Sequence, residues 1–507
     1  MKLPVIACAA IDHLRSESAL AVYRNVGLAT LVGLIAIFIG LASAVLPAIL
    51  SAGLIVLPLA LTASWRWPIL IAIATPVLAF GLVPFAALDF SRFTEITLIL
   101  GTVVALLKSA NEHIRAGKTP FLDALRYMKK PLIFFMVLWS IALIHGALIS
   151  KNHFAASDAK RYIGYLALII FSFIAGKKPS FLPRIIIGAG TLSAFFLIIQ
   201  LGTGWKVFAG FKGFMEGGAG SGFEDVARGS AMGGDYLVIF MLFYSLSTAS
   251  LPGARHRALF AMMIPIYLFG AIATYSRGMW AGLAIAFIIF PIIEYRNFFR
   301  ASRSLIILTA TCAAISVTVY PWAPRPFDAI AGRLQSITGE GGRGTSVGAR
   351  LDENAKGIES IKSHPILGLG HGGEYKKFTP QAERGFVNEA TFIHNSYLWM
   401  MVKFGIFGLI FVLALSWKIL SEAWRLQNTK SHDIRPLRSG AICFMIAWLT
   451  NGMSSPVWAQ ATDLVALSLI IVMIGTLRNN ALPRTGNHEV QHRDMHLEQQ
   501  VLHPPVR

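Results

Sequence analysis

The chain has 507 residues, of which 55% are hydrophobic and only 14% are charged. A soluble domain carries about a quarter charged residues on its water-facing surface, so this composition excludes a large soluble enzyme. The formal net charge of +19 does not indicate nucleic-acid binding either, because the lysines and arginines stand in short clusters beside long apolar runs. That arrangement is typical of the flanks of membrane spans.

Apolar stretches of spanning length follow one another along most of the chain. They cover residues 26–46, 48–64, 68–88, 93–108, 131–150, 162–176, 185–202, 235–251, 259–275, 278–293, 304–322, 394–417, 439–455 and 462–477. A lipid-exposed backbone has to satisfy its own hydrogen bonds, so each span is expected to be helical. Several stretches are short, and the first pair could form a re-entrant hairpin. We therefore predict an all-α polytopic membrane protein with about 12–14 transmembrane helices.

The basic clusters predict the orientation and the division of the chain. With a cytoplasmic N-terminus, the clusters fall in every second loop, as the positive-inside rule requires; loop 151–161 is the one short exception. The predicted parts are N-terminal helices at 1–322, which include a glycine-rich outer loop at 203–234, and a large outer loop at 323–393. C-terminal helices follow at 394–477, and a polar cytoplasmic tail at 478–507.

The large outer loop contains one predicted amphipathic helix. Between Arg350 and Ser363, apolar residues recur at helical spacing, and His364-Pro365 should end the helix. The glycine run Gly368–Gly373 comes after a helix and a proline, not after a strand, so we interpret it as a turn and not as a nucleotide site. A connection of this length without a domain of its own is usually functional.

Two arginines near the predicted outer boundary are candidates for binding an anion. Arg277 lies between two apolar runs, in the segment that also holds Tyr275, and Arg228 lies in a glycine-rich stretch before a span. A guanidinium group binds diphosphate oxygens through paired donors. The alternatives are an interfacial arginine that extends its side chain to water for Arg277, and an ordinary loop arginine for Arg228.

His394 is the candidate general base. It opens a predicted span at the end of the large loop and is followed by Asn395. Histidine accepts a proton near neutral pH, which suits activation of a hydroxyl group. The alternative is a structural histidine at the membrane boundary. The sequence shows no nucleophile triad or carboxylate pair. The tail histidines His488, His492 and His496 recur every four residues, as metal ligands on a helix can, but the tail has little apolar content and we interpret it as solvated, so we expect no metal and no cofactor.

These residues resemble a known family, the O-antigen ligase and polymerase superfamily of membrane glycosyltransferases. His394-Asn395, nine residues, and then Gly405-Ile-Phe-Gly408 are similar to the ligase pattern after the large periplasmic loop. Arg277 and Arg228 resemble the two arginines that hold the lipid diphosphate, although Gly234-Asp235 departs from the expected pattern after Arg228. Arg350 with the turn after its helix resembles the helix and turn in the family's loop.

The resemblance implies a C-type membrane glycosyltransferase-like fold in the bacterial inner membrane, with the active site facing the periplasm. It implies a metal-independent, inverting transfer of a glycan from undecaprenyl diphosphate to a hydroxyl of lipid A–core. Arg277 and Arg228 would bind the diphosphate and His394 would act as the base; Arg350, Asn395 and Tyr275 are candidate substrate-binding residues. The expected partners are the two lipid-linked substrates and membrane lipid, without nucleic acid.

Three alternatives remain from the sequence. An O-antigen or exopolysaccharide polymerase of the same superfamily would use a similar donor with a lipid-linked acceptor. A protein glycan transferase is a third enzyme of this kind. A polysaccharide transporter or flippase should show two similar halves and charges near mid-membrane, and the sequence shows no internal repeat.

Overall fold

The computed structural model describes residues 68–80, 90–116, 120–203, 231–254, 256–322, 324, 327–328, 330–332, 346–375, 393–428 and 434–481. The chain divides into two units, residues 1–73 and 74–507. The predicted spans at 26–46 and 48–64, Arg228 and the tail from residue 482 lie outside the described residues. The second unit contains nearly all of the described helices.

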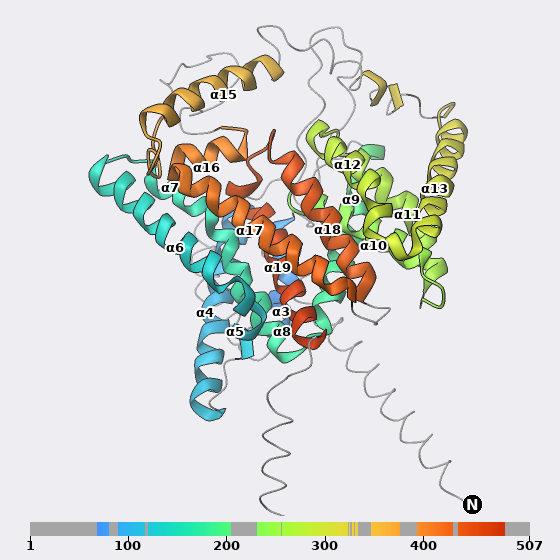
Figure 1. Ribbon diagram of the computed structural model, residues 1–507, viewed down its shortest axis with the longest axis horizontal. Helices are drawn as coiled ribbons and strands as arrows, with labels where there is room; N and C mark the ends of the chain where they lie inside the picture. The colour runs from blue at the N-terminus through green and yellow to red at the C-terminus, as the bar shows by residue number, and fades with distance from the viewer. Residues whose placement is uncertain are drawn as a thin grey trace, which may run out of the picture. The chain divides into compact units, whose positions relative to one another are not determined.

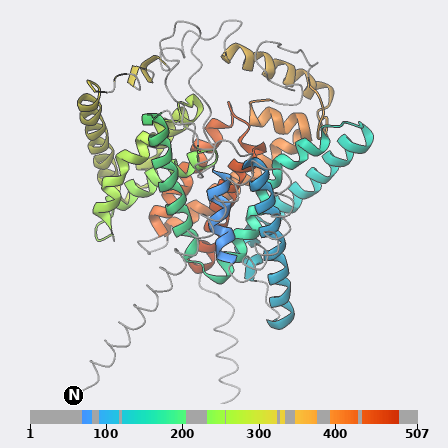
Figure 2. The ribbon, with the colours of Figure 1, turned by 180° about the vertical axis from the view of Figure 1, so that it is seen from behind.

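Every regular element in the described residues is a helix (Figures 1 and 2). The first half contains α3 (Pro68–Ala79), α4 (Phe90–Ala116), α5 (Pro120–Leu125), α6 (Lys129–Ile144), η2 (His145–Ile149), α7 (Ala155–Ala159), η3 (Lys160–Leu166), α8 (Ala167–Lys177) and α9 (Phe181–Thr203). The second half contains α10 (Gly234–Ser250), α11 (Arg257–Ile272), α12 (Arg277–Ile293), α13 (Phe298–Val319), α15 (Ser346–Ser363), α16 (Ser396–Phe404), α17 (Ile406–Arg425), α18 (Ile434–Asn451), η7 (Val457–Ala459) and α19 (Ala461–Ala481).

The protein is an all-α, multi-pass membrane protein. Within the described residues, seven helices are long and apolar enough to cross a membrane, and three shorter apolar helices accompany them. Each predicted stretch from residue 93 onward falls on helical segments. The total of 12–14 spans stays a prediction, because the first two stretches lie outside the described residues.

Helix α10 is buried along nearly its whole length because α9, α11 and α18 surround it. Small residues allow these close approaches, as is usual between membrane helices. A Cβ at Gly190 of α9 would press against Met241 and the Leu237 carbonyl of α10, and one at Gly282 of α12 would lie 2.7 Å from the Ala447 Cα of α18. Helices α10, α12 and α18 therefore form one tightly packed group.

Helix α19 joins this group to the N-terminal helices. It contacts α5, α8 and η3 as well as α10 and α17. The Tyr127 hydroxyl, just after α5, donates to the Ile471 carbonyl of α19 at 2.7 Å, across a separation of 344 positions in the chain. A Cβ at Gly475 would overlap the Ala124 carbonyl oxygen. Segments near the two ends of the described chain are thus held side by side.

The predicted span at 394–417 is two helices. Helix α16 ends at Phe404 and α17 begins at Ile406, because Gly405 has a φ of 62° and a ψ of −155°, a conformation reserved for glycine. A Cβ at Gly408 would overlap the Met400 carbonyl oxygen, so the second glycine lets α17 pack closely on α16. The two glycines of the Gly-x-x-Gly pattern therefore have separate backbone roles.

The amphipathic helix of the outer loop is present as α15 and packs along α16. Its apolar residues Leu351 and Ile358 are 57% and 45% exposed, whereas Glu353 and Gly357 are buried. A Cβ at Gly357 would lie 3.0 Å from Ile393 Cδ1. The face of α15 that packs against the bundle is therefore the one that carries Glu353 and Gly357, and the face that carries Leu351 and Ile358 points away from it.

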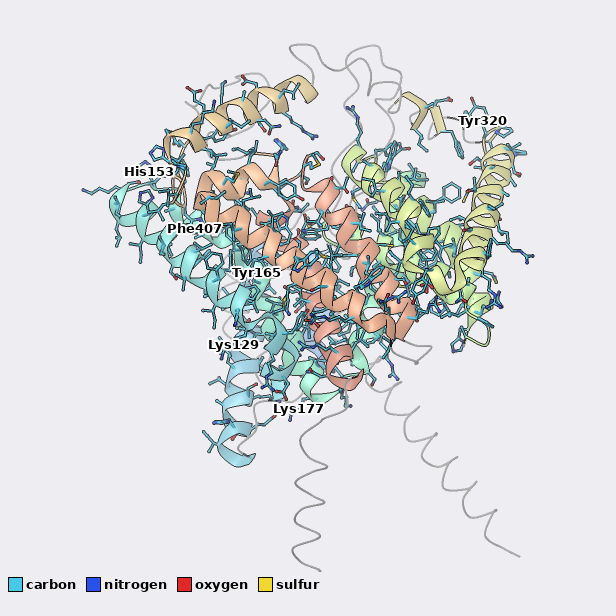
Figure 3. The ribbon with its side chains drawn as sticks, viewed as in Figure 1. Lys129, His153, Tyr165, Lys177, Tyr320 and Phe407 are labelled. Carbon is cyan, nitrogen blue, oxygen red and sulfur yellow. The ribbon has the colours of Figure 1, made fainter. Side chains whose placement is uncertain are left out.

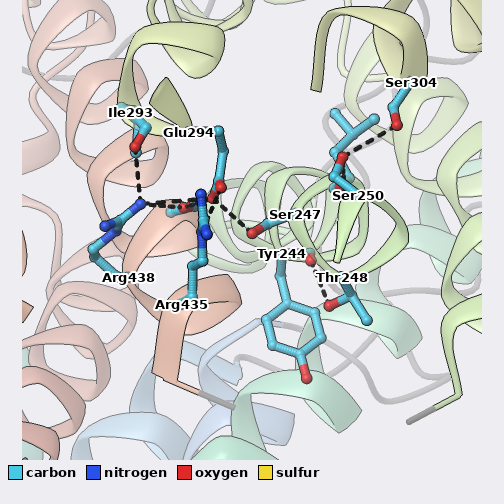
Figure 4. A network of polar contacts seen from close by, with 11 residues as sticks. Tyr244, Ser247, Thr248, Ser250, Ile293, Glu294, Ser304, Arg435 and Arg438 are labelled. Atoms are coloured by element: carbon cyan, nitrogen blue, oxygen red, sulfur yellow. Dashed lines mark hydrogen bonds and ion pairs between the residues drawn. The ribbon is translucent and has the colours of Figure 1, made fainter. Parts of the chain in front are cut away.

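An ion network ties three helices together (Figure 4), and it joins the last turn of α12 to the first turn of α18, at the end of these helices remote from Arg277. Glu294, fully buried after the last turn of α12, pairs with Arg435 of α18 at 2.6 Å and with Arg438 at 3.6 Å. It also accepts from Ser247 of α10 at 2.7 Å and from Ser439 at 2.5 Å. Figure 3 shows Lys177 at this same end, with His153 and Tyr320 toward the end that carries α15.

Replacing Glu294 with alanine is expected to destabilise the folded protein by about 3 kcal/mol, because two arginines would lose their buried counter-ion. Thermal unfolding of the purified protein in detergent measures this loss. The matched control is Glu112→Ala, which breaks a partly exposed pair with Lys177 at the same end and should cost less than about 1 kcal/mol. An equal melting temperature for Glu294→Ala and the control would contradict the role of the network.

Candidate functional site

The first turn of α16 positions His394. Asn395 is the N-cap of this helix, and its Oδ1 accepts from the backbone N–H groups of Tyr397 at 3.0 Å and Leu398 at 3.2 Å. Asparagine is among the preferred N-caps because its short side chain satisfies these otherwise unpaired donors. The structure thus gives Asn395, a candidate substrate-binding residue, a capping role that fixes the histidine before it.

The connection between α18 and α19 holds this turn in place. Ser396 N donates to the Gly452 carbonyl at 2.8 Å, and Ser396 Oγ donates to the Ser455 carbonyl at 2.6 Å. The Tyr397 hydroxyl donates to the Leu449 carbonyl at 2.7 Å. The backbone that carries His394 is therefore fastened to the end of α18 by three hydrogen bonds.

Arg277 begins α12, and the residue after it lies against the same connection. A Cβ at the next residue, Gly278, would overlap Asn451 Oδ1 and Ser454 Oγ. Tyr275, two residues before Arg277, is fully buried with a φ of 47° and packs on Leu201, Trp280 and Ile330. Burial raises the pKa of its hydroxyl, so it remains neutral at physiological pH.

Four helices, α10, α12, α16 and α19, begin around this connection. Tyr236 of α10 accepts from Asn451 Nδ2 at 2.5 Å, and a Cβ at Gly233 would overlap the Thr462 carbonyl oxygen. Helix N-termini attract anions through their free N–H groups and dipoles. Helices α10 and α19 carry Asp235 and Asp463 in their first turns, whereas α12 and α16 carry no acidic residue there.

His394 has a carboxylate partner that the sequence did not predict. Its Nδ1 lies 2.9 Å from Glu353 Oε2, and its backbone N–H donates to the same oxygen at 3.3 Å. Glu353 is 6% exposed. An ionised carboxylate only accepts, so Nδ1 carries the proton and Nε2 is left as the basic nitrogen. Sequence reasoning missed this pair because Glu353 is 41 positions away.

Arg350 and Arg228 are the remaining predicted site residues. Arg350 is half-buried on α15, one turn before Glu353 on the same face of the helix. Arg228 is outside the described residues; Ala231, three positions later in the chain, is buried at the start of α10. The structure thus brings Arg277, Asn395 and His394 to one end of the bundle.

The turn after α15 donates hydrogen bonds to the last carbonyls of α16, which ends at Phe404. Leu369 N donates to the Val402 carbonyl at 2.7 Å, and Gly370 N donates to the Lys403 carbonyl at 3.2 Å. These carbonyls belong to the last turn of α16, where helical partners run out. Ile406 N in turn donates to the Pro365 carbonyl at 2.9 Å. The predicted glycine turn is confirmed, and its function is to link the outer loop to the helix that begins after His394.

A buried ion pair anchors the end of this turn. Lys403 and Asp158, both almost fully buried, lie 2.6 Å apart. Asp158 also accepts from Gly372 N at 2.8 Å, and Lys403 donates to the Gly373 carbonyl at 2.9 Å. Because each charge is paired and hydrogen-bonded, α7, α16 and the turn are fixed together.

His371 lies between these anchors in an aromatic environment. Its ring contacts the rings of Trp139, Tyr162 and Phe404. The side chain is fully buried, and neither ring nitrogen has a hydrogen-bond partner within the described part of the chain. Burial lowers the pKa of this imidazole to about 4, so it is neutral in the folded protein.

Comparison with known proteins relates part of the chain to one family. Residues 258–413, a segment that contains Arg277, Arg350, His394 and the Gly405–Gly408 pattern, match the model of the O-antigen ligase family. The resemblance to the O-antigen ligase family is thereby confirmed. A Haemophilus influenzae protein, named as an uncharacterized protein, is 28% identical over 184 residues, which cover 34% of this chain and 43% of that protein.

Acidification should lower the stability of the folded protein through protonation of His371. The unfolded imidazole titrates near pH 6.5 and the folded one near pH 4, so the unfolded state binds more protons in between and stability falls as the pH drops below about 6.5. Between pH 7 and pH 5 the loss is about 2 kcal/mol.

His371→Phe, which keeps an aromatic ring, should therefore lose less stability than the wild type over this pH interval. Melting temperatures at pH 7 and pH 5 measure the difference. His153→Phe, at an exposed position, is the matched control and should behave like the wild type. A His371→Phe protein as acid-sensitive as the wild type would disprove the effect.

Proposed function

We propose that this protein is an O-antigen ligase, which transfers a glycan from undecaprenyl diphosphate to a hydroxyl of lipid A–core at the periplasmic face of the bacterial inner membrane. The observation that carries the proposal is that Gly278, next to Arg277 at the start of α12, and Ser396, in the first turn after His394, both lie against the Asn451–Ser455 segment. A diphosphate group at the start of α12 would meet a guanidinium group and a helix N-terminus without a competing carboxylate in its first turn.

The chemistry is a direct displacement. His394 Nε2 takes the proton of the acceptor hydroxyl, whose oxygen forms a bond to the anomeric carbon of the glycan. The bond from that carbon to the undecaprenyl diphosphate oxygen breaks, and its electron pair stays on the diphosphate. Arg277, together with Arg228, stabilises this negative charge. One displacement inverts the anomeric centre, and the imidazolium then releases its proton to water.

Two other functions remain as outcomes of experiment. A polymerase of the same superfamily would use the same donor and would place the glycan on another lipid-linked unit. The spacing from His394 to Gly405 favours the ligase. For a transporter, the arginines would have to line a path across the membrane, whereas Arg277 lies at the start of α12, at one end of that helix.

Arg277→Ala should reduce glycan transfer by at least about 100-fold, because a donor to the developing charge is lost. His394→Ala should also abolish measurable transfer through loss of the base. The assay uses full-length protein in vesicles with purified donor and lipid A–core. The matched controls are Arg300→Ala and His153→Ala, both at exposed positions, and both should transfer normally. Normal transfer by Arg277→Ala and His394→Ala would refute these roles.

Deletion of the gene should leave lipopolysaccharide with bare core, since no other step would join the glycan to it. A strain without a polymerase would instead retain single repeat units on the core. Electrophoresis of lipopolysaccharide from the deletion strain distinguishes the two.

Transfer in vesicles should continue with a chelator present, and dependence on an added divalent cation would contradict the metal-free mechanism.

A further inference from the structure

Helix α15 enters the site with its polar face. It runs beside α16, and the eleven residues from Glu353 to Ser363 span about 16 Å, close to the length of α16 at about 13 Å. One end of this stretch is fixed by the Glu353–His394 pair, and the other by the turn that completes α16 at Val402 and Lys403. The helix is therefore held at both ends against the element that begins after His394.

The apolar pattern of α15 does not account for this docking. Leu351 and Ile358 are exposed, so burial of apolar side chains supplies little of the energy that orients the helix. At Gly357, one turn away from Glu353, the Ile393 side chain packs on α15, since a Cβ there would lie 3.0 Å from Ile393 Cδ1. A carboxylate buried at such a contact is costly unless it is paired, and Glu353 is paired with both the ring and the backbone N–H of His394.

We infer that Glu353 is a positioning residue that holds His394 with Nδ1 protonated and Nε2 directed to the reacting hydroxyl. The inference rests on the proposed function, because it assigns Glu353 to the base of that reaction. As Nε2 takes the proton from the acceptor hydroxyl, the ring becomes an imidazolium, and the Glu353 carboxylate compensates its charge without taking the proton. The carboxylate comes from the outer loop, so the site is complete only when α15 is docked.

The test compares Glu353→Ala and Glu353→Gln in the full-length protein in vesicles. Glu353→Ala should lower kcat by about 100-fold with the KM for the donor nearly unchanged, because the orientation of the base is lost while diphosphate binding is kept. Glu353→Gln should recover part of this loss, since its amide oxygen still accepts from Nδ1. Asp352→Asn, next to Glu353 but exposed and paired with Lys356, is the matched control.

The role in positioning needs a readout that a merely structural role would not move. The split between kcat and KM supplies it, because a residue that only orients the base changes kcat and leaves the KM for the donor in place. An unchanged kcat in Glu353→Ala would overturn the inference. If Glu353→Ala instead raises the KM for the donor together with its loss of kcat, and the outer loop is cleaved faster by a protease, Glu353 would serve only to dock α15.

The outcomes separate this inference from the proposed function. If His394→Ala is inactive and Glu353→Ala is fully active, only the positioning role fails. If His394→Ala transfers glycan like the wild type, the proposed function loses its base and the role of Glu353 fails with it. Absence of transfer by the wild-type protein in the same vesicles would likewise remove both.

Discussion

The broken helix end at Gly405 is the constraint on which the rest of the site depends. Helix α16 stops there because Gly405 adopts a glycine-only conformation, and its last carbonyls need donors from elsewhere. The turn after α15 supplies them through Leu369 and Gly370, and the buried Asp158–Lys403 pair fixes that turn. A long outer loop is thereby joined to the bundle at a defined place, which lets α15 present Glu353 to His394.

The other end of α16, its first turn, is fixed by the connection from α18 to α19. That short segment receives hydrogen bonds from Ser396 and touches the start of α12, so it is a common support for His394 and Arg277. Far from it, the Glu294 network ties the other ends of α10, α12 and α18. Rigid support at both ends favours a site whose parts keep their relative positions, as positional catalysis requires.

The sequence predicted the helical membrane fold, because lipid permits few backbone solutions. His394 and Arg277 stand at the ends of apolar runs, and the structure has them just before the start of α16 and at the start of α12. The sequence did not predict the break at Gly405, since an apolar run of that length is also compatible with one continuous helix. The sequence also did not predict which face of α15 packs against the bundle, because hydrophobic periodicity marks Leu351 and Ile358, which are exposed. Glu353 could be found only from tertiary contacts, as its partner is 41 positions away.

The central claim is that Arg277 and His394 serve one reaction centre beside the α18–α19 connection. The most direct test is a structure of the protein bound to undecaprenyl diphosphate carrying its glycan. The account predicts that the diphosphate contacts Arg277 at the start of α12 and that the anomeric carbon faces His394 Nε2. A diphosphate bound elsewhere in the bundle, with Arg277 and His394 opening to separate surfaces, would contradict it.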